Sequence, residues 1–169
     1  MIPKRVKQFY INVVDTMNEE DYNYVEKILN KEEFELFKKL LKSEQKHSLR
    51  IAKEIEYNID NKMINNEEIL KNRDILIKAA LLHDVGKSKQ KLNVIDKSII
   101  VILNKLTKGE LIKLEKSKKV QCYYKHSEYG YEILKDKIDN KLILNIVKNH
   151  HNNDCDEIVE FFKKIDDDN

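Results

Sequence analysis

Hydrophobic residues recur every three or four positions along most of the chain, the spacing of amphipathic α-helices. This pattern predicts helices over 4–17, 19–29, 32–42, 43–59, 68–83, 94–106, 109–120, 125–136, 139–151 and 155–166. The polar stretch DNKMINNEE at 60–68 is typical of a loop. We therefore predict an all-α protein, a single-domain helical bundle of roughly eight to ten helices.

The composition supports a helical protein. Glycine (3) and proline (1) are too scarce for a sheet built on tight turns. Charged residues make up 37% of the chain, but the net charge is only +2, which indicates a solvated helical surface. Because no cluster combines basic and aromatic residues, we expect no nucleic-acid partner.

No segment of the sequence suggests secretion or membrane insertion. The start, MIPKRVKQFYINVVD, has no apolar core followed by a cleavage site, and no run reaches the roughly 18 residues that span a bilayer. Cys122 and Cys155 form no CxxC pair, so we expect reduced thiols. These features predict a cytoplasmic protein without a membrane partner.

The candidate chemistry lies in the histidines. His47, His83, His126 and His150 each fall on the apolar stripe or at the end of a different predicted helix. Taken alone, such a histidine is more often a hydrogen-bonded core residue than a ligand. Together, several buried imidazoles without partners would each carry a desolvation cost, which a shared metal removes.

Two aspartates join this pattern. Asp84 directly follows His83 where the most hydrophobic helix ends, and Gly86 breaks the helix soon afterwards. Asp166 continues the stripe of Ile158 and Phe162, whereas Asp167 would turn about 100° away.

The ordered segments KHSLRIAKEI, ALLHDVGK, KHSEYGYEILK and NHH, with a late aspartate, resemble the HD-domain metal-dependent phosphohydrolases of the HDIG type. The resemblance covers about 43–168 and implies a helical bundle around a metal site. Residues 43–169 would form the hydrolase core, which the helices of 1–42 complete. The implied ligands of a first metal are His47, His83, Asp84 and Asp166. For a second metal they are His126 and His150, with Asp84 bridging the two ions.

The resemblance leaves the role of His151 open between a metal ligand and a contact to substrate phosphate. Imidazole and carboxylate donors suit divalent Fe, Mn, Zn or Mg, and two such ions would activate a water. Lys87 stands where the HD-x-x-K form of the family has a lysine that reaches the substrate phosphate. The alternative is a solvated lysine, since KSKQK holds several. The expected catalytic residues are Asp84 and Lys87.

The expected substrate is a small phosphorylated molecule, a phosphomonoester or phosphodiester such as a nucleotide. NHHNND lacks the Gly-Tyr-Pro signature of the cyclic-di-GMP phosphodiesterases, which argues against that substrate. Three other readings remain: an HD-type di-iron oxygenase, a non-catalytic HD signalling or interaction module, and a helical protein with core histidines. The oligomeric state is left open.

Overall fold

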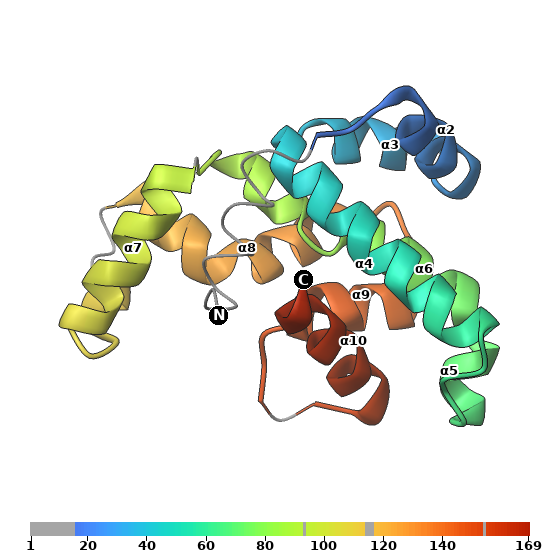
Figure 1. Cartoon of the computed structure of the whole chain (residues 1–169). Coiled ribbons are helices and arrows are strands. Elements are labelled where there is room, and N and C mark those ends of the chain that lie inside the picture. The colour runs from blue at the N-terminus through green and yellow to red at the C-terminus, as the bar shows by residue number, and fades with distance from the viewer. Residues whose placement is uncertain (1–15, 93, 114–116, 154) are drawn as a thin grey trace, which may run out of the picture.

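The computed structural model describes residues 16–92, 94–113, 117–153 and 155–169 (Figure 1). This part of the chain contains nine α-helices and no β-strand, which confirms the predicted all-α fold. The helices are α2 (Glu19–Ile28), α3 (Lys31–Lys38), α4 (Lys42–Asp60), α5 (Glu67–Lys71), α6 (Arg73–Leu82), α7 (Val94–Leu106), α8 (Lys118–Leu134), α9 (Lys141–Asn149) and α10 (Glu157–Asp168). Two short 3₁₀ helices, η1 (Val85–Lys89) and η2 (Glu110–Lys113), interrupt the series.

Polar side chains mark most of the helix starts. Asn18 and Asn30 form capping boxes. In each, the asparagine side-chain oxygen accepts from a backbone N–H of the first turn, and an acidic side chain of that turn accepts from the backbone N–H of the asparagine. Asn140 and Asp156 cap α9 and α10 through their side-chain oxygens. Because these local contacts set where the helices start, most helices begin close to where the hydrophobic periodicity predicts them.

Several boundaries differ from the sequence prediction, and the helix expected over 125–136 is the later part of α8, which begins at Lys118. The helix expected over 68–83 is two helices, α5 and α6, separated at Asn72. The helix expected over 109–120 is wrong, because η2 occupies its first part and α8 begins at Lys118, behind the cap Ser117. The helix expected over 32–42 ends at Lys38. The helix expected over 4–17 falls almost wholly on residues outside the described part.

The main hydrophobic core lies between α4, α6, α9 and α10, with α2 and α3 packed over one end (Figure 1). Ile51, Leu81 and Phe162 are fully buried there. Val25 and Phe37, from the first 42 residues, belong to the same core. The division of the chain at residue 42 stays a prediction, but the described helices before it share one core with the rest.

A smaller core lies under α7, η2 and the start of α8. It is formed by Leu92, Ile100, Leu111, Val120 and Cys122. In Figure 1, α7 lies at the edge of the molecule and α8 connects it to the centre. Among the described helices, none has both the length and the apolar character needed to cross a bilayer.

The chain packs most closely where η1 meets α8. A Cβ atom added at Gly86 would lie 1.9 Å from the carbonyl oxygen of His126 and 2.5 Å from the backbone nitrogen of Gly130. Only a glycine permits this approach. It places the residues after His83 directly against the middle of α8, where His126 lies.

Candidate metal centre

Five histidines and two aspartates converge from five helices. His83 and His150 are the C-terminal caps of α6 and α9, so each of these helices delivers an imidazole at its end. Asp166 lies in the last turn of α10, and the structure confirms that this helix reaches it. The full set that the structure brings together is His47, His83, Asp84, His126, His150, His151 and Asp166.

Three of the imidazoles are held by the same local contact. In each, Nδ1 lies within hydrogen-bond distance of the carbonyl oxygen three residues earlier: His83 with Ala80 at 2.8 Å, His126 with Tyr123 at 3.0 Å and His150 with Val147 at 2.9 Å. A carbonyl only accepts, so Nδ1 carries a proton, and in the neutral ring Nε2 then has a free lone pair. Such a contact fixes the tautomer and ring orientation of metal-binding histidines.

Asp84 lies between two of these imidazoles. Its Oδ2 is 3.4 Å from Nε2 of His83, and its Oδ1 is 3.4 Å from Nε2 of His126. The ammonium of Lys87 forms an ion pair with Oδ2. The two oxygens of this fully buried carboxylate thus face different histidines.

His47 and Asp166 close the other side of the cluster, although 119 positions separate them in the chain. Nε2 of His47 is 2.9 Å from Oδ1 of Asp166, and Nε2 of His83 is 3.8 Å from the same oxygen. The late aspartate predicted from the α10 stripe therefore lies beside the first two histidines.

His151 occupies a different position from the other histidines, because it is exposed. Its Nε2 is 2.9 Å from Nε2 of His126. Since Nδ1 of His126 donates to Tyr123, Nε2 of a neutral His126 can only accept, and His151 must donate. His151 therefore lies at the outer edge of the cluster, where it can reach either an ion or a bound molecule.

Burial and mutual charge keep this cluster in a state suited to cations. Burial lowers the pKa of His126 to about 3 and also lowers the pKa values of His47 and His150, so these imidazoles are neutral at pH 7. Burial by itself would raise the pKa of Asp84, but His83 and Lys87 outweigh it and hold that pKa well below the usual value. Neutral imidazoles beside ionised carboxylates are the donor set that divalent metals take.

A metal fits this cluster because several atoms that could bind it are buried without a hydrogen-bond partner in the described part of the chain. They are Nδ1 of His47, Nε2 of His83, Nε2 of His150 and Oδ1 of Asp84. Leaving such atoms unpaired costs roughly 1–3 kcal/mol each. Three groups have their donor atoms within 4.8 Å of one another: His47, His83 and Asp84; His126, His150 and His151; and His83, His150 and Asp166.

A cavity of about 320 Å³ opens beside the cluster. Lys87, His126 and His151 form its polar side. Its other lining residues are Leu92, Cys122, Tyr123 and Tyr124. Burial by itself would lower the pKa of Lys87, but the charges of Asp84 and Glu44 outweigh burial and raise it. A cation therefore borders the cavity.

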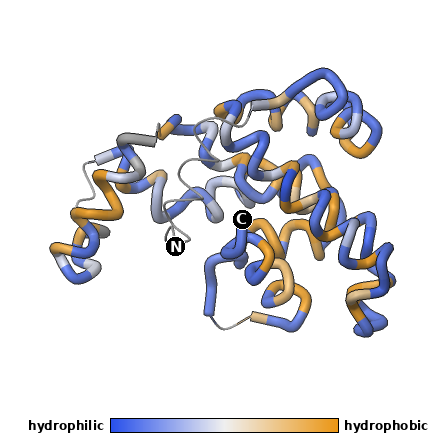
Figure 2. The backbone as a smooth tube through the Cα atoms, viewed as in Figure 1, coloured by the Kyte–Doolittle hydropathy of each residue, from blue (hydrophilic) through white to orange (hydrophobic). Residues whose placement is uncertain are grey.

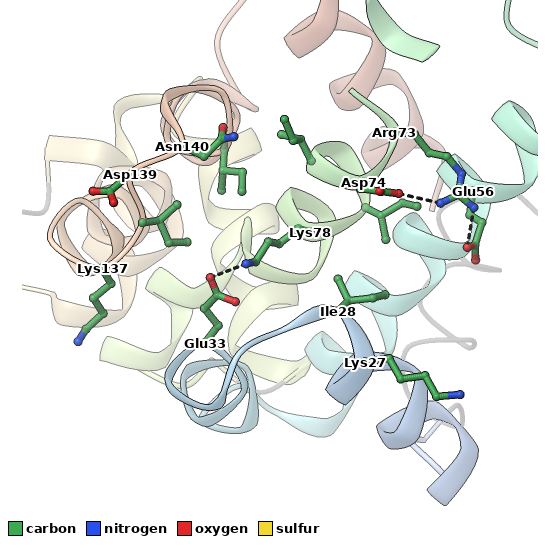
Figure 3. Close-up of a pocket in the computed structure, with 14 residues that line it drawn as sticks. Lys27, Ile28, Glu33, Glu56, Arg73, Asp74, Lys78, Lys137, Asp139 and Asn140 are labelled. Atoms are coloured by element: carbon green, nitrogen blue, oxygen red, sulfur yellow. Dashed lines mark hydrogen bonds and ion pairs between the residues drawn. The ribbon is translucent and has the colours of Figure 1, made fainter. Parts of the chain in front are cut away.

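A larger cavity, of about 620 Å³, lies elsewhere and borders none of the histidines (Figure 3). Its charged residues largely neutralise each other: Lys78 pairs with Glu33 at 2.7 Å, and Arg73 pairs with Glu56 at 2.9 Å. We place the candidate site at the smaller cavity, because His126 and His151 of the cluster line it, whereas the larger cavity borders none of the histidines.

Sequence reasoning did not find two of the cavity residues. Leu92 and Cys122 are ordinary apolar positions, and no local signal distinguishes them from the core. Tyr123 and Tyr124 come shortly before His126 in the sequence, and the structure places both on the cavity wall. Tyr124 also donates a hydrogen bond to Asn104, which ties that wall to α7.

Comparison with known protein families matches residues 45–160 to the HD domain. The matched range includes every residue of the cluster except Asp166. No curated protein and no solved structure matches the chain.

Proposed function

The chain belongs to the HD-domain family, and from this we propose that it is a metal-dependent phosphohydrolase acting on a small phosphorylated molecule. The family consists mostly of metal-dependent hydrolases. The cluster of histidines and aspartates can hold a divalent metal. Our proposal goes beyond family membership in three respects: the hydrolysis of a phosphoric ester, the presence of two ions and the substrate class.

One observation carries the proposal: buried imidazole nitrogens and an aspartate oxygen lie together without partners, beside a cationic lysine and an open cavity. Core histidines in an inert bundle would have their second nitrogen satisfied. Here His83 and His150 have only Nδ1 satisfied.

Each residue has a proposed task. His47, His83, Asp84 and Asp166 would hold one ion, and His126 and His150 a second, with Asp84 shared between them. When bound, such ions lower the pKa of water and stabilise negative charge on a phosphoryl group. Lys87 would leave Asp84 and place its ammonium on a phosphate oxygen, and His151 would donate to the phosphate or complete the second ion's ligands.

The cavity favours a compact substrate. Its volume of about 320 Å³ is at the lower end of small-molecule sites. Tyr123 and Tyr124, whose rings meet edge to face at 5.1 Å, add aromatic surface to the cavity lining beside its charged residues. A phosphate ester with a planar group, such as a nucleotide, matches both sides.

The first test is metal content by elemental analysis of protein purified without oxygen or chelator, followed by assays on p-nitrophenyl phosphate, bis-p-nitrophenyl phosphate and nucleotides. We expect about two ions per chain and phosphate release that chelators abolish. Asp84→Asn should lose both metal and activity, whereas Asp139→Asn, at the larger cavity, should change neither. Protein that takes up no Mn²⁺ or Fe²⁺ after reloading would contradict the proposal, and oxygen uptake without phosphate release would favour the oxygenase reading.

Lys87 has a separate test. Lys87→Ala should keep its metal and lower kcat/KM for phosphate esters by about 100-fold, because a cation aimed at the developing charge is lost. Lys89→Ala is the matched control, since Lys89 is exposed and outside the cavity lining. Equal kinetics for the two variants would limit the role of Lys87 to its ion pair with Asp84.

A further inference from the structure

The cavity beside the metal cluster lies between that cluster and the smaller hydrophobic core. Leu92 and Cys122, which line the cavity, are buried members of the smaller core, and Tyr123 and Tyr124 pack against it. None of the described lining residues belongs to the main core. One part of the cavity is therefore supplied by the cluster and Lys87, and the other part by the smaller core.

The elements around the smaller core contribute nothing to the metal cluster in the described part of the chain. The cluster residues come from α4, α10, the ends of α6 and α9 and the middle of α8, whereas the smaller core is formed by Leu92, α7, η2 and the first turns of α8. We call the described residues of 92–124 the outer lobe. Figure 2 shows hydrophobic residues along much of its helix α7, which lies at the edge of the molecule. The outer lobe is thus placed to contact the part of a bound molecule that the ions do not hold.

Hydrogen bonds fix the part of the cavity wall that the outer lobe supplies. The thiol of Cys122 donates to the carbonyl oxygen of Gln90 at 3.3 Å. The hydroxyl of Tyr124 donates to Asn104, in the packed part of α7. A wall held in this way is ordered before a ligand arrives, which reduces the entropy lost on binding.

Charge is distributed unevenly around the cavity. Besides the histidines, Lys87 is the only residue with a charged side chain among the described lining residues. The outer lobe supplies uncharged side chains, and two of them, Leu92 and Cys122, are almost fully buried. A phosphate placed against these two residues would lose water without gaining a counter-charge. A flat apolar group would instead gain from burial and from contact with the rings of Tyr123 and Tyr124.

We propose that the outer lobe is the specificity element of the site and selects an ester with a single phosphate and a flat aromatic group. This inference rests on the proposed phosphohydrolase function. The phosphate faces Lys87 and the ions, and the flat group lies on Tyr123 and Tyr124. In the hydrolysis the bond between phosphorus and the ester oxygen breaks, water supplies the new oxygen on phosphorus, and the alcohol leaves with a proton from that water. The outer lobe therefore holds the leaving alcohol.

Nucleoside di- and triphosphates fit this arrangement poorly. Their additional phosphates either lie against the uncharged wall of the outer lobe or move the flat group away from it. In both cases the site loses one of its two contacts, with the phosphate or with the aromatic group.

The contact with the flat group is tested by kcat/KM for AMP and for glycerol 3-phosphate, which are both single-phosphate esters of aliphatic alcohols. We expect the wild type to favour AMP by about 10-fold or more, because only AMP has a base that stacks. Tyr123→Ala should lower this ratio by about 10-fold, through KM, and keep the metal content of the wild type. Tyr131→Ala is the matched control, since Tyr131 is also half-buried on α8 but lies outside the cavity lining. It should leave the ratio unchanged.

The preference for a single phosphate has its own test. Tyr124→Arg adds a cation to the wall, and it should raise kcat/KM for ATP relative to AMP by about 10-fold, because the additional phosphates gain a counter-charge. Tyr124→Phe removes the hydrogen bond to Asn104 without adding charge, and it should not favour ATP. Melting curves check that the variants fold.

Equilibrium dialysis of AMP and ATP against the metal-loaded protein separates this inference from the proposed function. Protein that hydrolyses AMP with the same selectivity in Tyr123→Ala as in the wild type would overturn the role of the outer lobe and leave the phosphohydrolase standing. Protein that binds AMP more tightly than ATP, loses this preference in Tyr124→Arg and releases no phosphate would support the outer lobe and contradict hydrolysis. A wild type that prefers ATP in both binding and turnover would overturn the inference.

Discussion

Replacing Gly86 by alanine is the sharpest test of how the fold builds the metal centre. The new Cβ would lie 1.9 Å from the carbonyl oxygen of His126, and ordinary contact begins at about 3.4 Å. The other close atoms are also backbone atoms of α8, so no side-chain rotation relieves the clash. η1 and α8 must therefore separate by about 1.5 Å, a distance that follows from the two contacts above.

This separation acts on stability and on the site together. Overpacking of this kind typically costs about 1–3 kcal/mol, which lowers the melting temperature of a chain this size by about 2–12 °C. It also moves Asp84, just before η1, away from His126 on α8, where their contact is now 3.4 Å. A shift near 1 Å at a reacting centre can cost about 100-fold in rate.

The assay is a melting curve in chelator beside metal content after reloading, with phosphoesterase activity as the third measurement. Gly130→Ala is the matched control, because its Cβ would meet only the end of the Val147 side chain below 3 Å, at 2.9 Å. Alanine also favours the helix interior by about 1 kcal/mol, which offsets the contact. If Gly86→Ala melts and binds metal like the wild type, close packing of η1 on α8 does not position Asp84.

Three further predictions follow from individual contacts. Asp166→Asn should weaken the first metal by at least about 10-fold by competition with a chelator, because a carboxylate donor is lost; unchanged affinity would remove Asp166 from the site. The metal-free protein should have a constant melting temperature above about pH 6.5 and lose stability below it. The pKa values of His126 and of other buried histidines are depressed in the folded chain, so below about pH 6.5 the unfolded chain binds more protons than the folded chain. Each such group then lowers the free energy of unfolding by up to about 1.4 kcal/mol per pH unit; a flat profile down to pH 5 would contradict this. Asp21→Asn should cost about 2 kcal/mol in urea unfolding, because Lys46 at 2.6 Å and Lys53 at 3.0 Å lose a buried partner; a variant as stable as the wild type would show that these pairs contribute nothing.

The sequence by itself determined the helices and the residues that carry the chemistry. Helical hydrogen bonds join residues four apart, so the spacing of apolar positions and capping residues such as Asn140 decides local structure. For the same reason the stripe of α10 was enough to select Asp166 over Asp167 for the inner face, and the structure places Asp166 beside His47. Helix ends were less well determined where a local contact competed, as at Asn72 and Ser117.

Only the tertiary structure decided how those residues meet. The separation of His47 from Asp166 spans 119 positions, and no local rule relates them. The division of the two Asp84 oxygens between His83 and His126 depends on the close approach at Gly86, which local spacing does not reveal. Likewise, α7 reads from sequence as one more amphipathic helix, and only packing shows which of its apolar sides the rest of the chain leaves exposed. Distances between segments follow from the packing of the whole core, because side chains far apart in sequence must fill one shared volume.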